Sequence, residues 1–107
     1  MKNWILPLAL ISTLLSTASY GNDEYDVFGF PQASCGSWTT EQTNESTTSL
    51  QYESWVLGWV SAAGWAGIKI KETDPYAIIQ WINNYCQSNP LEKLTSAVKK
   101  LIYELEE

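Results

Sequence analysis

Hydrophobic positions in the last third of the chain recur at the spacing of an α-helix. From residue 90 to residue 104 they form one stripe with charged side chains outside it, whereas from 75 to 88 apolar residues cover most of the circumference. An Asp-Pro pair at 74–75 and an Asn-Pro pair at 89–90 each combine an N-cap side chain with a proline suited to the first helical turn. The pattern therefore predicts two neighbouring helices, 75–88 and 90–104. The stripe of the second comprises Leu91, Leu94, Val98, Leu101, Ile102 and Leu105.

Residues 50–67 form the most hydrophobic stretch before this pair and also carry a helical pattern. Because apolar residues lie nearly all round this helix, we expect it at the centre of the domain. Small residues at every fourth position form a ridge that another helix can approach closely. In this stretch the uncharged run that starts at Trp55 ends at residue 68, which is too short to span a bilayer comfortably. Core packing is therefore favoured over membrane pairing. The expected buried arc comprises Tyr52, Trp55, Val56, Trp59, Val60, Ala63 and Ala66, and the ridge comprises Ser54, Gly58, Ala62 and Ala66.

Shorter elements connect these helices. Ser34 or Ser37 can cap a short helix over residues 34–43. The sequence NESTTS at 44–49 predicts a polar turn. Glycines at the start of 64–71 predict a break of the central helix followed by a loop.

The N-terminal part of the chain has two sections. Residues 1–21 combine a positive residue, an apolar run and small residues, as a cleaved secretory signal peptide does. Residues 22–33 are acidic, contain interleaved aromatics and have no period, so they predict an extended arm. Its hydrophobic side chains should fold back onto the core, because leaving each bare costs about 1.5–3 kcal/mol. They are Val27, Phe28 and Phe30.

Cys35 and Cys86 are the only cysteines. Export places them in an oxidising compartment, periplasmic or extracellular, which favours one disulfide over a metal site or a reactive thiol. Two thiols without histidine also make a poor zinc site. Such a disulfide would stabilise the chain by about 4 kcal/mol. The predicted fold is all-α, a small orthogonal bundle of about four helices stapled by one disulfide, in a single domain spanning 34–107 after the signal peptide.

Charge narrows the range of partners. Without residues 1–21 the chain keeps five lysines and twelve acidic residues, with no arginine and no histidine, a formal net charge of 5 − 12 = −7. Nucleic acids and anionic lipid surfaces are disfavoured, because phosphate contacts need clustered Lys or Arg. We expect another protein as the partner, a secreted effector or an unfolded client. A second copy of the chain is a further candidate, and stable membrane insertion after signal cleavage is not expected.

The loop at 64–71 is the best candidate for a binding surface. It places hydrophobic residues beside lysines, as partner-binding patches do. The alternative, that its apolar side chains only cap the core, is favoured by roughly three to two. The predicted partner-binding residues are Trp65, Ile68, Lys69, Ile70 and Lys71.

Catalysis is not expected. The chain has no histidine, and no Gly-rich phosphate loop or nucleophile elbow is present in the sequence. Glu41 with Glu45, and Glu72 with Asp74, are carboxylate pairs, but chance pairs are expected among twelve acidic residues. We predict no enzyme activity, no cofactor and no metal site.

Several segments of the chain carry a resemblance to known proteins. They are CGSW at 35–38, WVLGWVS at 55–61, Asp74, Ala77-Ile78, WINNYC at 81–86 and NPL at 89–91. Together they resemble a family of small exported bacterial helical proteins. The layout is similar to the HdeA-type periplasmic acid chaperones, and the Gly-containing centre and Asn-Pro segment resemble the Tai-type immunity proteins against type VI amidases. The resemblance covers roughly residues 34–105 and implies a helical fold with a disulfide between an early helix and the end of the penultimate one.

Two functions are therefore expected in order of preference. The first is a small periplasmic protein-binding protein, inhibitor or immunity-like, that occludes a partner stoichiometrically. The alternative is an acid-activated periplasmic chaperone, because protonation of twelve carboxylates at low pH would swing the net charge and loosen the domain. A structural accessory role in an envelope assembly is a third class.

Overall fold

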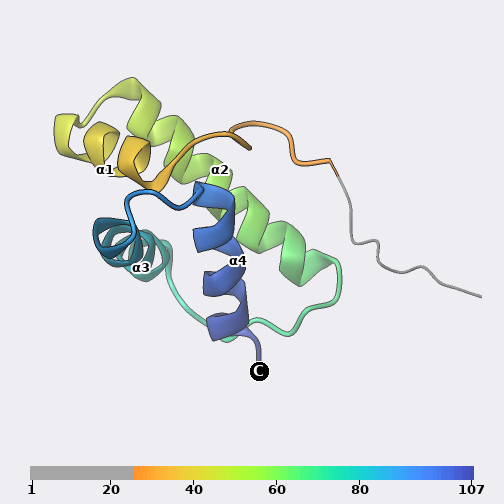
Figure 1. Ribbon diagram of the computed structural model, residues 1–107. Coiled ribbons are helices and arrows are strands. Elements are labelled where there is room, and N and C mark those ends of the chain that lie inside the picture. The colour runs from red at the N-terminus through yellow and green to blue at the C-terminus, as the bar shows by residue number, and fades with distance from the viewer. Residues whose placement is uncertain (1–25) are drawn as a thin grey trace, which may run out of the picture.

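The computed structural model describes residues 26–107, and the predicted signal peptide lies outside this range. The described chain folds into four α-helices: α1 (Cys35–Asn44), α2 (Thr47–Trp65), α3 (Pro75–Ser88) and α4 (Leu94–Leu105). They form a small bundle in which every helix contacts the other three (Figure 1). The predicted all-α fold is confirmed. Within residues 26–107 no helix is long and apolar enough to cross a membrane.

Serine and aspartate side chains start three of the helices. The Ser34 hydroxyl accepts the backbone N–H of Ser37 (3.0 Å) and caps α1. Ser46 caps α2 in the same way. The Asp74 carboxylate accepts the N–H of Ala77 (2.9 Å) at the start of α3. Each contact satisfies a backbone donor that has no partner inside its helix. The prediction that the Asp-Pro pair begins a helix at residue 75 is confirmed.

The prediction that the Asn-Pro pair at 89–90 begins the last helix is wrong. α4 begins at Leu94 instead of residue 90, and Asn89 ends α3, donating its side-chain amide to the Tyr85 carbonyl (2.9 Å). The residues that follow pair with the chain before α1: Cys35 N–H donates to Glu92 O (2.7 Å) and Leu94 N–H to Ala33 O (2.9 Å). These backbone bonds hold the segment just before α4, where Lys93 is extended, against the chain before α1, and Leu91 is 96% exposed instead of joining the stripe.

The turn between the first two helices is shorter than predicted. Glu45 adopts a left-handed conformation (φ 50°) that closes α1, and Ser46 immediately caps α2. The predicted polar turn at 44–49 therefore shrinks to about two residues, and α2 begins one turn earlier than residue 50. The predicted loop after α2 is confirmed, with its break at residue 65.

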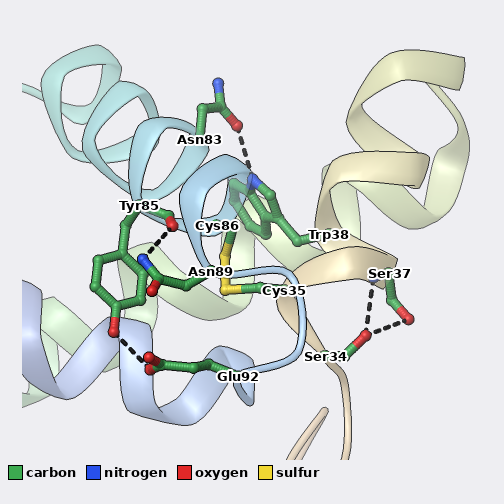
Figure 2. The surroundings of a disulfide bond; sticks show 9 residues. All are labelled: Ser34, Cys35, Ser37, Trp38, Asn83, Tyr85, Cys86, Asn89 and Glu92. Atoms are coloured by element: carbon green, nitrogen blue, oxygen red, sulfur yellow. Dashed lines mark hydrogen bonds between the residues drawn. A yellow bond between two sulfur atoms is a disulfide. The ribbon is translucent and has the colours of Figure 1, made fainter.

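The disulfide joins Cys35, at the first residue of α1, to Cys86, in the last turn of α3 (Figure 2). Both cysteines are fully buried, and their Cα atoms lie 4.6 Å apart across 51 positions of sequence. Beside them Trp38 is also fully buried, and its indole N–H donates to Asn83 Oδ1 (2.7 Å). The predicted staple is confirmed.

All four helices contribute to one core. Leu94, Val98 and Leu101 from α4 point inward as the stripe predicted, and Val56 and Val60 face them from α2. The remaining members of this core cluster are Cys35, Trp38, Tyr52, Ile78, Ile82, Cys86 and Ala97.

The arm lies along α2 and is only partly packed. The Phe30 ring makes edge contacts with Tyr52 (centroids 4.7 Å apart) and with Trp55 (5.9 Å). The Trp55 indole N–H donates to the Phe28 carbonyl (2.6 Å), which fixes the backbone of the arm. The Phe28 side chain itself is 81% exposed, so the expectation that it folds onto the core is wrong.

Candidate protein-binding surface

The face of α2 opposite the core is open, which corrects the prediction that this helix, apolar nearly all round, lies at the centre of the domain. Tyr52, Val56, Val60 and Ala63 are buried, but the expected arc is narrower than predicted because Ala66 is exposed. Trp55 and Trp59 are half-buried. No helix of the described chain packs on the small-residue ridge, which is exposed at all four positions: Ser54, Gly58, Ala62 and Ala66.

The loop after α2 is fixed to the end of α4. Lys71 N–H donates to the Leu105 carbonyl (2.7 Å), and Glu107 N–H donates to the Lys69 carbonyl (2.9 Å). The Lys71 ammonium also donates to the Glu104 carbonyl (3.0 Å). Gly67 turns the chain with φ +112°, a conformation that residues with a Cβ rarely adopt. The loop is therefore held as part of the surface instead of hanging free of it.

The structure separates the five predicted binding residues into three groups. Ile70 and Lys71 turn toward neighbouring elements: Ile70 packs against Gly64, and Lys71 is bound to α4. Ile68 is half-buried and lines a groove. Trp65, at the end of α2, is 91% exposed, and Lys69 is exposed as well.

The groove lined by Ile68 runs between α2 and α4 and has a volume of about 750 Å³. We call it the α4 groove. Its floor and walls are mainly apolar, with one lysine and one glutamate at the rim. Sequence reasoning missed the contribution of α4, because Tyr103 lies outside the hydrophobic stripe and is 76% exposed. The lining residues are Trp59, Ala62, Ala63, Ala66, Ile68, Lys99, Ile102, Tyr103 and Glu106.

A second hollow of about 380 Å³ adjoins the first on the side of the arm. Trp59 and Ala62 belong to both hollows, so the open face of α2 forms their common floor. The second hollow is lined by Asp26, Val27, Phe28, Trp55, Gly58, Trp59 and Ala62. The molecule thus presents a continuous, mostly apolar surface that runs from the arm to the C-terminal end.

A cluster formed by Tyr85, Glu92 and Lys100 lies outside the linings of both hollows. Tyr85 donates to the Glu92 carboxylate, as Figure 2 shows, and Lys100 sits over the Tyr85 ring at 5.4 Å from its centroid. A hydrogen bond with Tyr85 and then the charge of Glu92 raise the pKa of Lys100 above its ordinary value. Lys100 is exposed, and its contact with Tyr85 joins α4 to α3.

Both cysteines are in the disulfide, and residues 26–107 bring no three potential metal ligands together. Comparisons with protein-family models, with curated proteins and with solved structures find no match to this chain. The fold therefore defines its class, a disulfide-stapled all-α domain of four helices, while the resemblance to acid chaperones and immunity proteins stays a prediction.

Proposed function

We propose that the chain is a small exported protein whose function is to bind another protein and cover that partner's working surface. The observation that carries the proposal is the α4 groove. It is apolar, fixed in shape by the loop bonds to α4, and flanked by the exposed Tyr103. A preformed apolar groove with an exposed aromatic at its rim is typical of recognition surfaces.

Export is the second part of the proposal. A disulfide between two buried cysteines fits an oxidising compartment, where such bonds persist. The signal-like sequence at 1–21 supports the same compartment, the periplasm or the exterior. Within it, the excess of acidic residues would steer a basic partner toward the domain and raise the rate of encounter.

Stoichiometric occlusion suits the dimensions of this domain. A rigid bundle loses little conformational entropy on binding. Most of the free energy gained from contacts in the groove therefore contributes to the affinity. The inhibitor or immunity-like function follows from such binding without any chemistry in the chain itself. The expected partner, a secreted effector, would stay inactive for as long as the complex lasts.

Capture with a matched pair of variants tests the proposal. Tyr103→Ala removes an exposed tyrosine from the groove, and Tyr76→Ala removes one of similar exposure (86%) from α3. The immobilised wild type and Tyr76→Ala should retain the same protein from periplasmic extract. Tyr103→Ala should lose it, with affinity lowered by about 1–4 kcal/mol as for an aromatic hot spot. Equal capture by all three chains would contradict the proposal.

The acid-activated chaperone is separated from this function by a second readout. Suppression of client aggregation at pH 2–3, unchanged in Tyr103→Ala, would favour a chaperone that unfolds to expose its core. An inhibitor working through the α4 groove has no reason to show that activity.

A further inference from the structure

The open face of α2 carries a regular stripe of which only Trp55 makes contacts within the described chain, with Phe28 and Phe30 of the arm and with Trp59. Its positions 51, 55, 58, 62 and 65 follow spacings of four, three, four and three residues, the repeat of helices that pack side by side. Four of the five positions are exposed, and Trp55 is half-buried. The residues of this stripe, the α2 stripe, are Gln51, Trp55, Gly58, Ala62 and Trp65.

Gly58 is the least explained residue of the stripe. It lies in the interior of a 19-residue helix, where glycine is disfavoured. A Cβ atom added there would meet no other atom within 4 Å, so nothing in the described chain requires a glycine. Glycine and alanine side by side on a helix face allow a second helix to approach closely.

Four of the five stripe positions are symmetric about residue 60 in their order of large and small residues. Trp55 and Trp65 lie five positions on either side of it, and Gly58 and Ala62 lie two positions on either side. A two-fold axis at this level of the helix relates these four positions to one another with the helix direction reversed. Contacts between two identical copies have this self-complementary form.

We propose that a second copy of this chain docks on the α2 stripe, with the two α2 helices antiparallel. Gly58 of each copy then faces Ala62 of the other, which lets the helices approach closely. Trp65, which is 91% exposed in the single chain, is covered by the region of Trp55 of the second copy.

The surroundings of the stripe agree with this arrangement. The arm flanks the N-terminal half of α2 and α4 flanks its C-terminal half, because both reach Trp59 and Ala62. Reversing one copy therefore sets the arm against the α4 groove of the other. The exposed Phe28 gains an apolar groove, and Asp26 meets a rim that carries Lys99 beside Glu106.

This inference does not rest on the proposed function, although the second copy and a foreign partner would compete for the α4 groove. Self-association is measured on the purified chain alone. Capture of a partner is measured through Tyr103, so either proposal can fail while the other stands.

Light scattering over a range of concentrations tests the dimer. The full chain is expressed for export and purified with its disulfide intact. Ala62→Gln and Ala77→Gln add the same side chain to an exposed alanine, the first on the α2 stripe and the second on α3. We expect dimers for the wild type and for Ala77→Gln, and at least tenfold weaker association for Ala62→Gln. A wild type that stays monomeric up to millimolar concentration, or an Ala62→Gln dimer of unchanged affinity, would overturn the proposal.

The antiparallel direction has its own test. Residues 58 and 62 both lie within α2, and in the antiparallel arrangement each faces the other across the axis. Under mild oxidation, a mixture of Gly58→Cys and Ala62→Cys chains should form an intermolecular disulfide faster than either variant alone. Disulfide formation by Gly58→Cys with itself at the same rate would indicate parallel helices and overturn the antiparallel arrangement.

Discussion

The two ends of the bundle differ in how completely their side chains are used. At the disulfide end, Cys35, Trp38 and Cys86 are fully buried, and the one polar atom of Trp38 is hydrogen-bonded. At the other end, α2 finishes in an exposed tryptophan, and the groove beside it is apolar and open. Tryptophan thus lies in the core at the disulfide end and on the surface at the other end. The disulfide end is therefore the more completely packed of the two, and the other end is the one for which we propose a binding role.

Removal of the disulfide should have the largest effect on the free energy of unfolding. Replacing Cys35 and Cys86 together by serine frees the chain between them and increases the entropy of the unfolded state. We expect the free energy of unfolding to fall by about 4 kcal/mol. Denaturant unfolding of the oxidised wild type and the double variant measures the difference. A loss below about 1 kcal/mol would mean that the closed end gains little from its staple.

Trp38 at the disulfide end and Trp65 at the other end should contribute very differently to the free energy of unfolding. Trp38→Phe leaves a space in the core and removes the bond to Asn83, which should lower the free energy of unfolding by about 2 kcal/mol. Trp65→Phe changes a side chain that is 91% exposed, so its effect should stay within about 0.5 kcal/mol. The same denaturant titration on dilute protein measures both. Equal losses would show that the open end is also needed for the fold.

The fold was predictable where one residue pattern had one physical outcome. The stripe of α4 and the Asp74 cap each specify a helix locally, and the two cysteines have only each other as partners. The Asn-Pro pair failed as a helix start because its use is decided by distant chain: Ala33 and Cys35 bind residues 92–94 through the backbone. No local pattern in 89–93 reports that pairing.

The candidate surface was only half predictable for a related reason. Trp65 and Ile68 were visible as apolar residues beside lysines in a loop. The second wall of the groove comes from Tyr103 and Ile102, which face it only because the loop is tied to the end of α4. The open face of α2 was missed because an apolar sequence tells how much surface should be covered, but not by which chain.

We propose that the open face of α2 serves an external contact and not the fold. Gly58→Gln is the variant that separates these two roles. Two quantities are measured on the same sample: the free energy of unfolding of dilute, monomeric protein, and the mass at high concentration. Our account predicts a monomer that is about 0.5 kcal/mol more stable, because a better helix former replaces glycine in open space, together with loss of the dimer. A less stable monomer, or a dimer that persists, would contradict it.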